Sequence, residues 1–174
     1  MNSKVNKLVT ASMLAALTCI ATMIIKVPTV GTNGYVNIGD SIVLLSTWLM
    51  GNPYGAVAAG IGSGLADLIS GYASYVPGTV IIKFLMSFVA FIVYKLLNKT
   101  KAPKIVNWVV SGVVAELIMV FGYFSYESTF LGYGLAAAAS IPSNLIQGIT
   151  CLVIGTILIA ALSRIKFFKE LSER

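Results

Sequence analysis

The sequence lacks histidine entirely, although the chain has 174 residues. Histidine is the commonest general base and metal ligand, so its absence argues against most hydrolytic and metal-dependent chemistry. Charged residues are also scarce, at 10% of the chain, where a typical soluble domain has about 25%. With 57% hydrophobic residues and a mean hydropathy of +0.91, the chain has the composition of a protein that resides in a bilayer.

Cysteines and phosphate-binding motifs are nearly absent as well. Cys19 and Cys151 are the two cysteines, and each lies inside an apolar run, which is typical of a small buried side chain rather than a disulfide or metal pair. The glycine-rich segment Gly60–Gly64 is not followed by the Lys-Ser/Thr of a phosphate loop, so it indicates close helix packing. We therefore expect no enzymatic activity, no metal and no cofactor.

Long apolar runs are what the sequence does contain. A hydrocarbon core of about 30 Å requires about 20 apolar residues per helix, and 174 residues suffice for six such helices. We expect an all-α membrane protein, with one integral membrane domain over residues 1–174. Its six transmembrane helices are expected at about 8–25, 38–50, 54–70, 78–97, 105–124 and 141–162.

Two alternatives to this arrangement concern the first two runs. The first run follows two lysines, as a secretory signal peptide does, but it is long and lacks a clear cleavage site, which favours its retention as a span. The run 38–50 is short for a full crossing unless it begins in the preceding loop. A five-span arrangement of the first two runs is therefore the main competing topology.

The net charge of +6 reflects orientation in the membrane. Ten of the twelve basic residues fall at 4–7, 95–104 and 164–174, before, between and after apolar runs. Basic residues beside spans mark the cytoplasmic side, so both termini are expected there. The outer segments would be 26–39, 71–77 and 125–140, which contain no lysine or arginine except Lys26. The charge pattern thus predicts topology, not nucleic-acid binding.

Most polar side chains within the spans are expected near the outer face. Gly51-Asn52-Pro53 is predicted to reverse the chain, which brings Asp40 and Asp67 to the same side. Lys83 lies about 9 Å below Pro77 at the helical rise, and Glu127 is expected just beyond the fifth span. Glu116 alone falls near mid-span. Charged residues inside membranes usually face a protein interior or cavity.

This clustering predicts an outward-facing pocket with apolar walls and convergent polar groups, as small-ligand sites have. The candidate substrate-binding residues are Tyr35, Asn37, Asp40, Asp67, Tyr72, Tyr75, Lys83, Tyr123, Glu127, Asn144 and Gln147. Structural roles remain open for several of them. Asp67 and Lys83 would form an ion pair, Asp40 would cap its helix, Asn144 and Gln147 would join helices, and the tyrosines would lie at the membrane interface.

Four stretches carry a resemblance to a known family. They are TASMLAAL with Ala11 and Ala15, GYVNIGD, NPYGAVAAGIGSGLADLISGYASYVPGTVIIK, and IPSNLIQG. In this order they resemble the S components, the substrate-binding membrane subunits of energy-coupling factor (ECF) vitamin transporters. The similarity covers nearly the whole chain. Within the family, the sequence looks most like the branch for hydroxymethylpyrimidine, pyridoxine or riboflavin.

The resemblance implies a function and partners. It implies a multi-pass protein of a bacterial cell membrane that captures a small water-soluble vitamin near the outer face, with hydroxymethylpyrimidine or pyridoxine expected first and riboflavin next. It also implies docking through Ala11 and Ala15 on a transmembrane coupling subunit, which works with two ATPase subunits. The segment 27–39 would act as a lid over the site.

Two other classes of function remain as alternatives. A transporter or channel that works alone would be driven by an ion gradient, with Asp67, Lys83 and Glu116 as an ion or proton relay. Such transporters often consist of two repeated halves, and the sequence shows no convincing repeat. A purely structural membrane subunit would not require the polar cluster.

Overall fold

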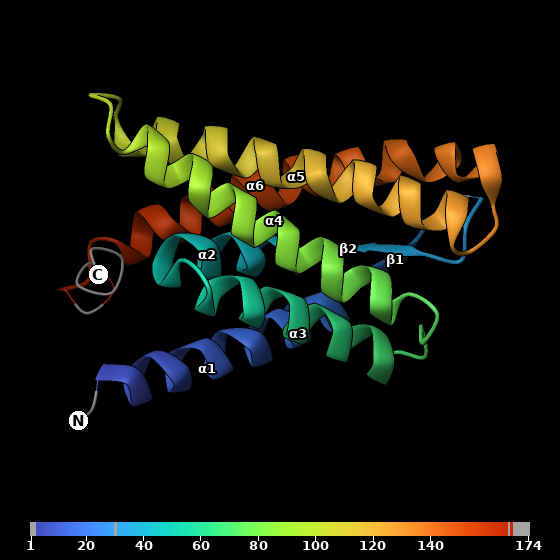
Figure 1. Ribbon diagram of the computed structural model, residues 1–174, viewed down its shortest axis with the longest axis horizontal. Coiled ribbons are helices and arrows are strands. Elements are labelled where there is room, and N and C mark those ends of the chain that lie inside the picture. The colour runs from blue at the N-terminus through green and yellow to red at the C-terminus, as the bar shows by residue number, and fades with distance from the viewer. Residues whose placement is uncertain (1–2, 30, 167, 169–174) are drawn as a thin grey trace.

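The structure, a computed structural model, describes residues 3–29, 31–166 and 168. Six α-helices account for most of them, joined by one short hairpin and one 3₁₀ helix (Figure 1). In chain order the elements are α1 (Ser3–Ile24), β1 (Lys26–Pro28), β2 (Tyr35–Asn37), α2 (Asp40–Met50), α3 (Tyr54–Ile69), α4 (Val76–Leu97), α5 (Lys104–Thr129), η1 (Gly134–Ser140) and α6 (Ile141–Leu162). The prediction of an all-α, six-helix fold is confirmed.

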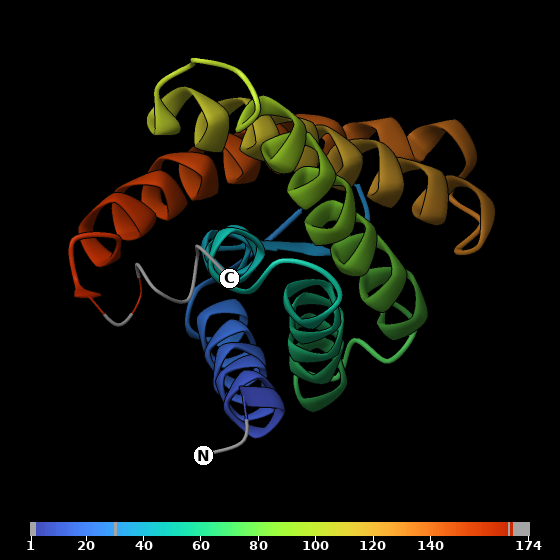
Figure 2. The same cartoon turned by 60° about the vertical axis from the view of Figure 1, so that its left-hand side comes forward.

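Helix α2 lies in the middle of the molecule, with the other helices arranged around it (Figure 2). All of its residues from Asp40 to Leu49 are buried, and it packs against α1, α3, α4 and α6. Its 11 residues extend about 17 Å at the helical rise. That length is too short to cross the hydrocarbon, but a helix enclosed by others does not need to reach both faces.

The six helices expected from the sequence are present, and the second is short for a full crossing, as its apolar run indicates. Among the described residues, four helical segments are long and apolar enough to cross a membrane: Lys4–Ile24, Val76–Leu97, Lys104–Thr129 and Gly134–Leu162. Helices α2 and α3 are shorter apolar helices. The fifth helix also continues to Thr129, so Glu127 lies within α5 rather than beyond it.

The chain reverses direction at Gly51-Asn52-Pro53, as predicted. Gly51 has a φ of 62°, a left-handed conformation that glycine adopts without steric cost. Its N–H closes α2 by donating to Thr47 at 3.0 Å, and its carbonyl accepts from Gly55 at 2.7 Å. The start of α2 and the end of α3 consequently lie at the same end of the molecule.

Glycines on α3 allow close helix packing. A Cβ atom at Gly60 would lie 2.9 Å from the carbonyl oxygen of Val80 on α4, and one at Gly62 would collide with the Ala15 carbonyl on α1. The predicted packing role of these glycines is confirmed. They hold α3 tightly between α1 and α4.

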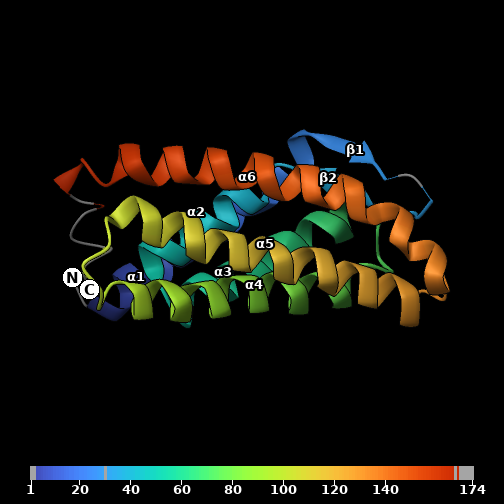
Figure 3. The same ribbon diagram turned by 90° about the horizontal axis from the view of Figure 1, so that it is seen from above.

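Both termini and the α4–α5 connection lie at one end of the molecule, and the hairpin and η1 lie at the other (Figures 1 and 3). The basic segments flanking α1, α4 and α5 thus belong to one end, as the charge pattern predicts. At the opposite end, segment 26–39, expected as a loop, contains a two-stranded antiparallel hairpin that pairs Lys26 with Asn37 and Pro28 with Tyr35.

Candidate ligand-binding site

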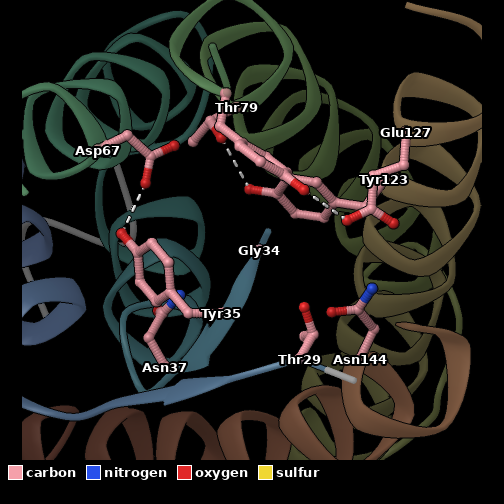
Figure 4. Close-up of a pocket in the computed structure, with 10 residues that line it drawn as sticks. Thr29, Gly34, Tyr35, Asn37, Asp67, Thr79, Tyr123, Glu127 and Asn144 are labelled. Carbon is pink, nitrogen blue, oxygen red and sulfur yellow. Dashed lines mark hydrogen bonds between the residues drawn. The ribbon is translucent and has the colours of Figure 1, made fainter. Parts of the chain in front are cut away.

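A polar pocket lies beneath the β1–β2 hairpin, where α3, α4, α5 and α6 converge (Figure 4). Figure 4 shows Asp67 and Tyr35 on one side of it and Glu127 and Asn144 on the other. Its lining residues come from the hairpin and from the ends of four helices: Thr29, Gly34, Tyr35, Asn37, Asp67, Tyr75, Thr79, Tyr123, Glu127 and Asn144. The pocket therefore exists only once the whole chain has folded.

Side-chain hydrogen bonds hold the hairpin over the pocket. The Tyr35 hydroxyl donates to Asp67 on α3 at 2.6 Å. The backbone N–H of Asn37 donates to Oε1 of Gln147 on α6, also at 2.6 Å. Three-residue strands have few ladder bonds of their own. These two bonds therefore fix the hairpin to both sides of the helical bundle.

Tyrosine hydroxyls satisfy the two carboxylates that line the pocket. Glu127 accepts from Tyr75 at 3.0 Å and from Ser140 at 2.6 Å, while Asp67 accepts from Tyr35. Burial, followed by the neighbouring carboxylate, raises the pKa of Tyr35 and of Tyr75 well above its ordinary value. Both phenols consequently stay protonated and act as hydrogen-bond donors.

A charged pair lies directly behind the pocket wall. Lys83 on α4 forms an ion pair with Asp40 at the start of α2, and both side chains are almost fully buried. Gln147 Nε2 donates to the second Asp40 oxygen at 2.6 Å, and the Lys83 ammonium lies 5.2 Å from the ring centroid of Tyr123. Each charge thus has partners, as a buried ion pair requires.

Two structural expectations are wrong at this point. Lys83 pairs with Asp40 rather than with Asp67, because central α2 places Asp40 next to α4. Asp40 is also not a helix cap, since Gly39 occupies that position and no side chain caps α2. The carboxylate of Asp40 is instead occupied by Lys83 and Gln147.

The structure brings most of the predicted binding residues together. Seven of them line the pocket: Tyr35, Asn37, Asp67, Tyr75, Tyr123, Glu127 and Asn144. Asp40, Lys83 and Gln147 form the buried layer behind it. Tyr72 packs against Tyr35 with its ring tilted and the ring centroids 4.5 Å apart, and it does not line the pocket. Glu116 does not line the pocket. It interacts electrostatically with Asp40 and Lys83, but neither of its carboxyl oxygens has a hydrogen-bond partner among the described residues.

Sequence reasoning missed three lining residues, Thr29, Gly34 and Thr79. Thr79 hydrogen-bonds the Tyr123 hydroxyl at 3.0 Å. It lies one helical turn before Lys83, so helical spacing alone could have indicated it. Thr29 and Gly34 flank the hairpin turn and are joined by a backbone hydrogen bond of 3.0 Å. They carry no charge, so nothing in the sequence distinguished them from other loop residues.

The pocket is closed in this conformation. Its free volume is about 20 Å³, which is room for about one water molecule. A vitamin-sized ligand can enter only if the hairpin or the tyrosine side chains move. The hairpin is the element whose contacts can open without unfolding a helix.

Fold and site together define a multi-pass membrane protein with a ligand pocket at one end of a six-helix bundle. The family model described as "ECF-type riboflavin transporter, S component" matches residues 2–164. The chain belongs to this family of ECF transporter S components. It is a transport subunit and not an enzyme.

Two solved structures share the fold of this chain, and a curated protein is similar to it in sequence. The S component of a bacterial ECF transporter shares the fold with a TM-score of 0.68 and 20% identity, over 93% of this chain and 98% of that one. The S component for biotin from an ECF-type ABC transporter shares the fold with a TM-score of 0.57 and 17% identity, over 90% of this chain and 92% of that one. A Pyrococcus woesei protein, described as an uncharacterized protein in gap 3′ region, is 32% identical over 136 residues, 78% of this chain and 87% of that protein.

Proposed function

We propose that this protein captures riboflavin, or a closely related vitamin, in the pocket beneath the hairpin and delivers it to an ECF transport complex. The observation that carries the proposal is a polar, aromatic-lined pocket at the end of the bundle opposite the termini, in a chain whose family is named for riboflavin. That family name supports riboflavin as the first choice, whereas the sequence alone ranks hydroxymethylpyrimidine and pyridoxine first.

The chemistry of the lining supports a ring-containing, hydroxyl-rich substrate. Tyr35, Tyr75 and Tyr123 offer aromatic faces for stacking. Asp67 and Glu127 offer carboxylate oxygens that accept hydrogen bonds from hydroxyls, and Asn144 offers an amide that both donates and accepts. Such groups discriminate between vitamins, because a ligand without matching partners leaves them unpaired.

The charge of the lining favours an unphosphorylated substrate. Asp67 and Glu127 are the charged residues of the lining, and both are acidic. The nearest buried cation, Lys83, is neutralised by Asp40. A phosphate group would face these two carboxylates, while Lys26 lies over the Tyr35 ring and outside the lining. We therefore expect free riboflavin to bind more tightly than its phosphate ester.

Docking on a coupling subunit is proposed for the groove between α1 and α3. Ala11, Ala15 and Ala16 line this groove together with Val57 and Ile61 of α3, and its volume is about 560 Å³. Small residues permit close approach of a second helix. The glycines of α3 pack against α1 and α4 and do not form a nucleotide-binding loop. Energy for uptake is therefore expected from ATPase subunits bound to the partner.

Riboflavin binding by the purified protein tests the substrate. We expect stoichiometric quenching of flavin fluorescence, because stacking on tyrosine quenches the ring, and weaker or no binding of pyridoxine, hydroxymethylpyrimidine and biotin. Binding of one of those ligands instead of riboflavin would refute the choice of vitamin. Binding of none would refute capture at this pocket.

Transport by the reconstituted protein tests the partners. Vesicles that contain this chain alone are expected to show no riboflavin accumulation, with or without an ion gradient. Vesicles that also contain the coupling subunit and ATPases are expected to accumulate it when ATP is supplied. Gradient-driven uptake by the chain alone would contradict the proposal and support a self-sufficient transporter.

A further inference from the structure

A second groove lies at the end of the molecule that carries the termini, away from the vitamin pocket. It is formed by Asn52 of the α2–α3 turn, by the last turns of α4, and by Lys99 just after α4. Its volume is about 330 Å³, and its lining comprises Asn52, Phe88, Phe91, Ile92, Lys95, Leu96 and Lys99. Nothing in vitamin capture or docking uses these residues.

The groove is divided into an apolar part and a basic part. Phe88, Phe91 and Ile92 lie one to two turns deeper along α4 than Lys95 and Lys99. The two lysines are exposed, and both line the groove. Helix α4 has 22 residues, about the thickness of the hydrocarbon core. The apolar part of the groove therefore lies at the level of the acyl chains, and Lys95 and Lys99 lie at the level of the lipid head groups.

The lysines are not neutralised within the described part of the chain. The acids found there, Asp40, Asp67, Glu116 and Glu127, are all buried. The ion pair seen among the described residues joins Lys83 and Asp40. Lys95 and Lys99 therefore present uncompensated positive charge beside an apolar wall, which is complementary to an anionic amphiphile.

We propose that this groove binds an anionic phospholipid from the leaflet on the side of the termini. The phosphate lies between Lys95 and Lys99, and an acyl chain runs along Phe88, Phe91 and Ile92. A bound lipid of this kind ties the α2–α3 turn to α4 and stabilises the basic end of the bundle.

Native mass spectrometry of the protein from nanodiscs of mixed phosphatidylglycerol and phosphatidylcholine tests the proposal. The wild-type protein is expected to retain one phosphatidylglycerol in preference to phosphatidylcholine. K95Q/K99Q is expected to retain it about thirty-fold less, since each lysine near an anionic surface contributes a factor of about five. K4Q/K7Q, a matched pair of lysines at the same end, is the control and should retain it normally.

Two further measurements make the result specific. Asn52→Asp, which adds a negative charge to the lining of the groove, should lower retention about fivefold or more, while circular dichroism in phosphatidylcholine remains that of the wild type. Inorganic phosphate added to the sample should not displace the lipid. Equal loss in K4Q/K7Q, no preference for phosphatidylglycerol, or displacement by inorganic phosphate would each overturn the proposal.

Discussion

The Lys83 side chain carries a positive charge and is only 3% exposed. A charge in this position costs several kcal/mol unless a partner of opposite sign compensates it. Asp40 supplies the negative charge, and the Tyr123 ring supplies a weaker attraction from the pocket side. The pair thus connects α4 to central α2 directly behind the ligand-binding wall.

Removal of one partner of this pair should destabilise the protein strongly. We expect K83M to lower the free energy of unfolding by about 3–5 kcal/mol, because Asp40 would remain buried with a negative charge and only Gln147 as a partner. K83M/D40L should recover much of the loss. Thermal melting of the wild type, K83M, D40L and K83M/D40L in one detergent measures the coupling between the two residues. Strictly additive effects of the two substitutions would contradict the prediction.

Glu116 is a buried acid whose polar atoms are less well satisfied. It is 6% exposed and interacts electrostatically with Asp40 and Lys83, but both oxygens lack hydrogen-bond partners among the described residues. Replacement by leucine removes the cost of burying an unsatisfied polar group, about 1–3 kcal/mol. We therefore expect E116L to melt at a higher temperature than the wild type. E127L is the matched comparison and should melt lower, because Tyr75 and Ser140 would lose their acceptor.

At the level of elements, Gln147 is one of the side chains that join the hairpin to the helical bundle. Its Oε1 accepts from the Asn37 backbone and its Nε2 donates to Asp40. In Q147L the hairpin loses one hydrogen bond to the helical bundle, which stabilises its closed position by about 1 kcal/mol. The fraction of molecules in which the hairpin has detached should therefore rise several-fold. Hydrogen exchange of residues 26–37 should accelerate by that factor. I146L, at a lipid-facing position beside it, should leave the exchange unchanged.

The α1–α3 groove allows docking to be separated from folding. Ala11 is buried in a cluster with Leu14 and Ala58, so a bulky residue there would disturb internal packing as well. Ala16 lines the groove but is exposed. We expect A16W to block assembly with the coupling subunit and ATP-driven uptake, while riboflavin binding stays within twofold of the wild type.

M13W is the matched control for that substitution. Met13 is 67% exposed on the same helix and does not belong to the groove. The added ring should therefore face lipid, and assembly should proceed normally. If A16W assembles as well as M13W in co-purification, the groove is not the docking surface.

The sequence allowed the helices to be predicted well but not the hairpin, for a physical reason. Helices of 16 to 26 residues leave long apolar runs between polar connections. Strands of three residues, one of them Lys-Val-Pro, are too short for an alternating pattern to appear. The hairpin depends instead on distant side chains, Asp67 and Gln147, which no local pattern reveals.

For the molecule as a whole, topology made the location of the site predictable and packing determined its contacts. Asp40 and Asp67 reach the same end because one turn reverses the chain between them. Lys83 pairs with Asp40 rather than Asp67 because α2 lies at the centre of the bundle. No simple pattern in the sequence reveals this central position. The lining threonine Thr79 was missed because a neutral side chain in a span has many ordinary roles.

Orientation in the membrane is the largest-scale prediction that the charges support. In a background in which Cys19 and Cys151 are replaced by alanine, Ser74→Cys lies in the α3–α4 connection beside the pocket end, and Thr100→Cys lies in the α4–α5 connection. Both native residues are exposed. Because basic segments remain in the cytoplasm, an impermeant maleimide should label the Ser74→Cys variant in intact cells. It should label Thr100→Cys only after the cells are permeabilised. The reverse pattern would place the pocket inside the cell, where a subunit that captures external vitamin could not work.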